Sequence, residues 1–161
     1  VFSDFQCPYC ARFSLEVKPR LVSDLVSTGK LYITLYDFPM TNIHKHATVA
    51  AMAARCAGDQ DKYWEYHDLL FTRLSEWSAR PDAPLDDFDR YAVELGLNRA
   101  TFSRCLEGKQ YAEVVDANRR FGEELRVTGT PTVFLNGRRV PGNVVLNYEA
   151  LANLIEEEVG A

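Results

Sequence analysis

The chain has 161 residues, 47% of them hydrophobic, so it is long enough to bury one substantial core. Its net charge of -5 argues against a surface that binds nucleic acid or an anionic membrane. No apolar run approaches the ~20 residues that would span a bilayer, and no charged-then-apolar export signal is present. Because the chain opens inside an expected strand, we expect that strand to be truncated and an upstream signal or anchor to be missing.

The first third of the chain predicts a β-α-β unit. Residues 1–5 read as the end of a buried strand. A helix follows from residue 8 to Gly29, with an expected kink at Pro19 and apolar residues at every fourth position: Phe13, Val17, Leu21 and Leu25. Residues 31–37 alternate on two largely apolar faces, which is typical of a strand covered on both sides. Strand, helix and strand at this spacing predict parallel pairing.

Strand patterning is absent from residue 42 to about residue 126. Helical periodicity there predicts five helices: 44–57, 62–77, 87–95, 99–107 and 110–126. Two short strands, 132–136 and 138–140, then flank a tight Asn136-Gly137 turn and form a hairpin. A last helix is expected over residues 147–159. The plan is therefore an α/β fold with a long helical insertion.

Cys7 and Cys10 lie at the corner between the first strand and the first helix. Pro8 suits the first helical position, so Cys7 falls at the N-cap. The free amides of the first turn and the positive end of the helix dipole favour a negatively charged sulfur there. We expect a lowered pKa for the Cys7 thiol and a reactive pair. A zinc site or an inert structural disulfide can share this spacing, so the spacing alone leaves those alternatives open.

This plan, with CPYC after the first strand and Thr130-Pro131 just before the third, resembles the thioredoxin superfamily, and specifically its DsbA-like branch. That branch has a helical domain inserted into the thioredoxin fold. The resemblance covers almost the whole chain and includes the segments FSDFQCPYC, DFPMTNIHKHA, KYWEYHDLLF and VTGTPTVFLNG. It implies a thioredoxin-like domain of residues 1–41 and 127–161 and an inserted helical domain of residues 42–126.

The resemblance also implies roles for the residues of the site. Cys7 would exchange with a partner's sulfur, and the more buried Cys10 would resolve the mixed disulfide. Pro131 would be the family's cis-proline, which holds the Thr130 backbone beside the pair, where it can bind an extended substrate segment.

Pro8 and Tyr9 separate the cysteines and tune their redox poise. Pro8 withholds an amide, and Tyr9 adds no positive charge, so we expect a reduction potential between about -270 mV and about -120 mV, the values of thioredoxin and DsbA. Many relatives carry a buried acid six positions before the first cysteine, but Val1 stands there in this chain. The direction of the nearby Asp4 side chain stays open, and we do not count Asp4 as catalytic.

A second cysteine pair, Cys56 and Cys105, lies in the helical insertion. We expect a structural disulfide, which the resemblance supports modestly; two separate buried thiols are the alternative. His44 and His46 have no second half-site nearby, so we expect neither a metal site nor a cofactor. Phe5 and Tyr9 could form an apolar rim for unfolded substrates, unless Phe5 packs inward.

By this resemblance, the protein is expected to be a DsbA-like thiol-disulfide oxidoreductase outside the cytoplasm of a bacterium, in the periplasm or at the cell surface. Its expected partners are cysteine-containing exported polypeptides and a membrane quinone-linked protein of the DsbB or vitamin K epoxide reductase type. No dimerisation domain is present in these residues, so a monomer is expected. Two alternatives stay open: a disulfide reductase or isomerase with the same site, and a redox-inactive regulatory module such as a soluble appendage of a membrane transporter.

Overall fold

The first two strands pair as the sequence predicts. In the computed structural model, which describes residues 1–160, β1 (Phe2–Ser3) and β2 (Tyr36–Asp37) are parallel, with Phe2 opposite Tyr36 and Ser3 opposite Asp37. The predicted second strand is shortened, because residues 31–35 are not assigned to a strand. Before β2, the contact with the first segment continues through Val1, whose ammonium donates to the Thr34 carbonyl at 2.8 Å and whose carbonyl accepts from the Tyr36 amide at 2.8 Å.

The helix between these strands is continuous but not purely α-helical. It consists of α1 (Pro8–Arg12), the π-helix η1 (Phe13–Val17), α2 (Lys18–Leu21) and the π-helix η2 (Val22–Val26). The disturbance expected at Pro19 is therefore present as π-helical turns on both sides of it, because proline cannot donate the backbone hydrogen bond of a regular helix. Gly29 ends the segment with a φ of +74°.

Six helices follow β2, and they match the helical insertion predicted from the sequence. They are α3 (Ala47–Gly58), α4 (Tyr63–Thr72), α5 (Leu74–Trp77), α6 (Leu85–Glu94), α7 (Arg99–Glu107) and α8 (Ala112–Glu124). One expected helix, 62–77, is divided at Arg73 into α4 and α5. Asn98 caps α7 as its spacing suggests, with its side chain accepting from the Thr101 amide at 3.0 Å.

The chain ends with a hairpin and two helices. Strands β3 (Phe134–Leu135) and β4 (Arg138–Arg139) are antiparallel, and both turn residues, Asn136 and Gly137, have positive φ as a two-residue hairpin turn requires. Thr132 bridges back to Phe2, which joins the hairpin to β1. Helices α9 (Gly142–Val145), which the sequence did not predict, and α10 (Tyr148–Gly160) complete the fold.

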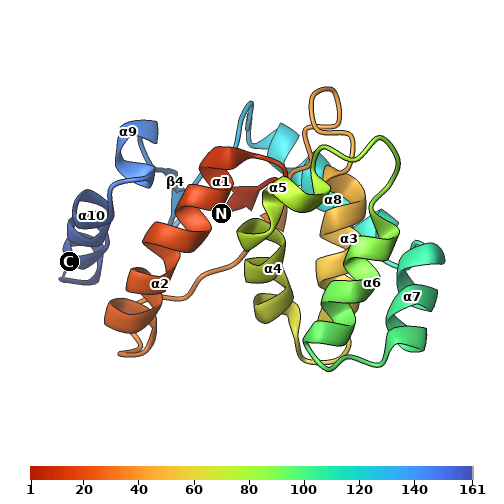
Figure 1. Cartoon of the computed structure of the whole chain (residues 1–161). Coiled ribbons are helices and arrows are strands. Elements are labelled where there is room, and N and C mark those ends of the chain that lie inside the picture. The colour runs from red at the N-terminus through yellow and green to blue at the C-terminus, as the bar shows by residue number, and fades with distance from the viewer. Residues whose placement is uncertain (161) are drawn as a thin grey trace.

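The long first helix separates two groups of elements (Figure 1). Helices α9 and α10 lie on one side of it, and α3 to α8 lie on the other. One apolar cluster joins Phe13, Leu21 and Leu25 to α10, whereas Cys7 and Cys10 pack with the core of the helical insertion. The reactive corner therefore lies at the junction of the two groups. No helix within residues 1–160 is both long and apolar enough to cross a membrane.

Candidate active site

Cys7 is held where the first strand turns into α1. It is the N-cap of that helix, with φ -78° and ψ 122°, and Pro8 takes the first helical position. The Cys7 amide donates to the Asp4 carbonyl at 3.1 Å, and the Cys7 carbonyl accepts from the Ala11 amide at 3.1 Å. Both Cys7 and Cys10 are free thiols, so the pair is in its reduced state.

The surroundings of Cys7 favour its thiolate. Its pKa is lowered from 9.0 to about 6, chiefly by a hydrogen bond from the Cys10 side chain. Burial opposes this shift, and the Thr130 side chain and the amides of Cys10 and Tyr9 add to it. A thiolate at the first turn of a helix is the form that attacks disulfides and is the better leaving group.

Cys10 is shifted in the opposite direction. It has no exposed surface, and burial raises the pKa of its thiol well above 9.0, helped by the hydrogen bond to Cys7 and by the charge on that sulfur. A hydrogen bond with the Ser3 side chain and one from the Asp4 amide, 3.4 Å from Cys10 Sγ, lower the pKa in part. At neutral pH the pair therefore holds one negative charge and one proton, with the charge at Cys7.

The structure brings Thr130 and Pro131 to this pair across more than 120 residues of chain. The Thr130-Pro131 peptide bond is cis, and Cys7 Sγ lies 3.3 Å from the Thr130 carbonyl oxygen. The Thr130 hydroxyl lies 3.8 Å from the sulfur of Met40, in the loop after β2. An extended polypeptide lying along residue 130 would therefore pass directly beside Cys7 Sγ.

The two expected rim residues behave differently. Tyr9 is 59% exposed, so its ring is available to a partner. Phe5 is buried, and it packs on Phe71 and against the ring of His67, with centroids 5.1 and 5.3 Å away. Phe5 is therefore a core residue rather than part of a rim, because the turn between β1 and α1 places its ring in the apolar cluster of the helical insertion.

Asp4, whose role the sequence left open, is buried, and its carboxylate is hydrogen-bonded to groups other than the cysteines. Its carboxylate accepts from the amides of Gln6 and Met40, both at 2.7 Å, and contacts Nδ1 of His44 at 2.8 Å. These contacts join the residues before Cys7 to the loop after β2. The same loop carries Met40, whose sulfur lies beside the Thr130 hydroxyl. Asp4 therefore orders the site through its carboxylate and touches Cys10 only through its backbone amide.

The remaining cysteines and histidines are structural. Cys56 and Cys105 form a disulfide that joins α3 to α7, with their Cα atoms 5.9 Å apart. His46 Nε2 lies 2.8 Å from the Arg80 carbonyl, so both His44 and His46 bind within the fold. In the part of the chain that the structure describes, no group of three or more His, Cys, Asp or Glu side chains is arranged to hold a metal ion.

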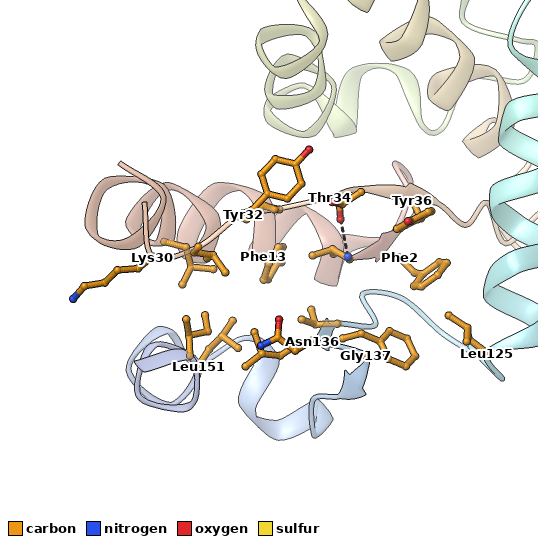
Figure 2. Close-up of a pocket in the computed structure, with 18 of the residues that line it drawn as sticks. Phe2, Phe13, Lys30, Tyr32, Thr34, Tyr36, Leu125, Asn136, Gly137 and Leu151 are labelled. Carbon is orange, nitrogen blue, oxygen red and sulfur yellow. Dashed lines mark hydrogen bonds between the residues drawn. The ribbon is translucent and has the colours of Figure 1, made fainter. Parts of the chain in front are cut away.

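An apolar groove of about 540 Å³ lies elsewhere, between residues 30–36 on one side and β3, the hairpin turn and α10 on the other. Figure 2 shows Phe13, Tyr36 and Leu151 among its lining side chains. Val1 and Thr34, which are joined by a hydrogen bond from the Val1 ammonium, also line it. Neither cysteine of the reactive pair lines this groove, nor do Thr130 and Pro131. The geometry of the thiol pair, and not this cavity, thus defines the candidate site.

Comparison with known proteins agrees with this geometry. A family model described as thioredoxin matches residues 1–157. The solved structure of oxidised BdbD from Bacillus subtilis superposes with a TM-score of 0.81 at 21% identity, covering 99% of this chain and 85% of that one. The likeness in structure supports the thioredoxin fold with a helical insertion.

Two curated relatives are matched over very different shares of their own length. The Na(+)/H(+) antiporter NhaA 1 of Salinispora arenicola is 38% identical over 152 residues, which are 94% of this chain but only 21% of the antiporter. The probable disulfide bond formation protein D of Bacillus anthracis is 25% identical over 162 residues, which are 98% of this chain and 71% of that protein. The chain thus spans about a fifth of the first relative and most of the second.

Proposed function

This chain belongs to the thioredoxin family, and from that premise we propose that it is a DsbA-like thiol-disulfide oxidoreductase that forms disulfides in exported proteins. One observation carries the proposal: a free Cys7 thiol with a pKa of about 6 lies 3.3 Å from the carbonyl of the cis Thr130-Pro131 peptide. This arrangement combines a stable thiolate with a backbone edge on which a substrate can lie.

The reaction begins with the Cys7-Cys10 disulfide. A substrate thiolate attacks Cys7 Sγ, the Cys7-Cys10 bond breaks, and Cys10 leaves with the electron pair and takes up a proton. A second substrate thiolate then attacks the substrate sulfur bound to Cys7, and Cys7 leaves as a thiolate. The substrate loses two electrons and gains a disulfide, while the protein ends as the dithiol seen here. The low pKa of Cys7 favours this direction because it makes Cys7 the better leaving group.

The same site supports the proposed substrate, and the family resemblance supports the proposed redox partner. Exposed Pro8 and Tyr9 and the backbone of Thr130 form the docking surface for an extended, cysteine-containing exported polypeptide. Electrons pass on to a membrane quinone-linked protein of the DsbB or vitamin K epoxide reductase type.

The chain itself works as a monomer outside the cytoplasm, and its own Cys56–Cys105 bond supports an oxidising compartment. Residues 1–41 and 127–161 form its thioredoxin-like domain, and residues 42–126 the inserted domain.

The test is a pair of assays on the purified chain, together with its reduction potential. An oxidase restores activity to a reduced multi-cysteine protein and has a potential above that of thioredoxin, about -270 mV. Cys7→Ser abolishes this activity, and Cys10→Ala accumulates covalent adducts on Cys7. Reduction of insulin disulfides without catalysed refolding, or a potential at or below thioredoxin's, would instead identify a reductase.

The identity to the antiporter favours a second candidate, a regulatory module attached to a membrane transporter. The two candidates differ in whether the thiols must react. An unreactive Cys7, measured by alkylation at neutral pH, would favour a module that works without redox chemistry. The lowered Cys7 pKa supports the enzyme.

A further inference from the structure

Residues 4–7 form a turn that leads from β1 into α1. The Cys7 amide donates to the Asp4 carbonyl at 3.1 Å, and the Gln6 amide donates to the Asp4 carboxylate at 2.7 Å. Cys7 has extended backbone dihedrals as the N-cap, so the helix that follows does not fix its φ and ψ. The Asp4 amide lies 3.4 Å from Cys10 Sγ. The turn therefore carries one reactive sulfur and contacts the other, so its position sets how the two sulfurs face each other.

Gln6, the residue directly before Cys7, anchors this turn to the helical insertion. Its side-chain oxygen accepts from the His46 amide at 2.6 Å, and its side-chain nitrogen donates to the Ser78 carbonyl at 3.0 Å. His46 is the N-cap of α3, and Ser78 is the C-cap of α5. The two helix ends are also joined to each other, because His46 Nε2 lies 2.8 Å from the Arg80 carbonyl. One side chain thus holds the turn against two connected helix ends.

The two partners of Gln6 require a carboxamide. The His46 group is a backbone donor and the Ser78 group is a backbone acceptor, so the side chain between them has to offer one acceptor and one donor. A carboxylate of the same length can accept from His46, but it places a second oxygen against the Ser78 carbonyl. An apolar side chain makes neither contact. The chemistry of residue 6 therefore decides whether the turn is held at both helix ends, at one or at neither.

We propose that Gln6 is a positioning residue that holds Cys7 within reach of Cys10 while a mixed disulfide at Cys7 is resolved. The inference rests on the proposed function, because resolution is a step of that reaction. The Cys10 thiolate attacks Cys7 Sγ, the Cys7-Cys10 bond forms, and the partner leaves as a thiolate with the electron pair. The proton that Cys10 loses balances the one that the departing partner takes up. This ring closure depends on the effective concentration of one sulfur at the other, which falls when the turn is free to move.

The test separates the two exchange steps. The reduced chain is mixed with oxidised glutathione, quenched with acid at intervals and analysed by mass. The first step adds glutathione to Cys7, and the second releases it as the Cys7-Cys10 bond forms. Gln6→Met should slow the second step by about tenfold and keep the rate of the first, which needs no second sulfur. The equilibrium constant for forming the Cys7-Cys10 disulfide with glutathione should fall by a similar factor. Gln6→Glu keeps only the contact with His46, so it should change both quantities in the same direction by less.

Gln60→Met is the matched control. The Gln60 side chain also bridges a backbone carbonyl and a backbone amide, both of Asn98, at 3.3 and 2.7 Å, but it joins the end of α3 to the start of α7. This variant should lose some stability and keep both rates and the equilibrium constant. A second step in Gln6→Met as fast as in Gln60→Met would overturn the proposal. If Gln6→Met does not fold, Gln6→Glu decides, and an unchanged second step there is equally fatal. Failure of the first step in the wild type would instead refute the proposed function.

Discussion

The surroundings of Cys7 and Cys10 make two chemically identical side chains unequal. One hydrogen bond between them lowers the pKa of Cys7 and raises that of Cys10, and the first turn of α1 and Thr130 strengthen the difference at Cys7. Complete burial raises the pKa of Cys10 and so increases the difference between the two thiols. Reactivity at this site therefore belongs to one sulfur, and the other acts only after the first has reacted.

The first prediction concerns the titration of Cys7. The ultraviolet absorbance of the thiolate, followed against pH in the reduced chain, should rise with a midpoint near 6. Cys10→Ala removes the largest cause of the lowered pKa, so the midpoint should move up toward 9.0. An unchanged midpoint in Cys10→Ala would mean that the helix and Thr130, not the neighbouring thiol, set the Cys7 pKa.

The same shift is linked to stability. Because the folded pKa of Cys7 lies below the unfolded value, the folded thiolate adds stability that is complete above pH 9 and is lost as the pH falls through about 6. The free energy of unfolding of the reduced wild type, relative to that of Cys7→Ser, should therefore increase as the pH rises from about 6 to 9. Denaturant unfolding across this range measures it.

At the scale of single residues, the sequence predicts the groups whose role follows from local position. The N-cap place of Cys7 follows from Pro8, and the turn at Asn136 follows from its own sequence. The hydrogen-bond partners of the Asp4 carboxylate were not predictable, because one of them, the Met40 amide, lies 36 residues further along the chain.

Among the elements, α8 packs closely against the rings of Phe2 in β1 and Phe38 after β2, and Gly122 permits this contact. A Cβ atom at this position would lie 2.6 Å from the Phe38 ring and 3.0 Å from the Phe2 ring. Both rings are buried in one cluster with Val127, so neither can move away freely. The glycine is thus required by packing, although alanine would suit the helix itself better.

The second prediction is that Gly122→Ala destabilises the protein by about 1–3 kcal/mol, the usual cost of overpacking a filled core, despite a gain in helix propensity of up to about 1 kcal/mol. Denaturant unfolding gives the difference. Gly160→Ala, in α10 with no atom within 4 Å of the added Cβ, is the control and should change stability by less than about 0.5 kcal/mol. Equal stability of the two variants would show that α8 can shift outward.

The type of each secondary-structure element was easier to predict than the residues at which it begins and ends. Helices α6, α7, α8 and α10 lie within about two residues of their predicted ranges at most ends, because their apolar periodicity and caps are local signals. The loss of strand structure at residues 31–35 and the division at Arg73 were not predictable, since both depend on partners distant in sequence. Pro19 indicated a disturbance, but its π-helical form needed the structure.

At the scale of the whole molecule, the reactive pair and the structural disulfide share one core. Cys7, Cys10, Cys56 and Cys105 all belong to the cluster built around α3, α4, α6 and α7. The Cys56–Cys105 bond joins two helices that are far apart in sequence, and so it limits how far the unfolded insertion can expand.

The third prediction is that replacing both Cys56 and Cys105 with serine lowers the free energy of unfolding by up to about 4 kcal/mol, as the chain-entropy model gives for a loop of this length. The Cys7 pKa and its alkylation rate should stay at wild-type values, because neither Cys56 nor Cys105 is among the groups that shift the Cys7 pKa. Thermal unfolding and alkylation measure the two effects. A changed alkylation rate would mean that the insertion tunes the active site.

The complete enclosure of Cys10 imposes an order of events on every encounter. Cys7 is itself buried but keeps 5% of its surface exposed, whereas Cys10 keeps none, so a partner can reach only the Cys7 sulfur. The first covalent intermediate therefore has the same connectivity whether electrons enter or leave the protein. Oxidant and reductant therefore compete for a single atom and cannot be bound there together. The protein therefore reacts with one partner at a time, and the net direction of electron transfer depends on whether oxidised or reduced partners are more abundant.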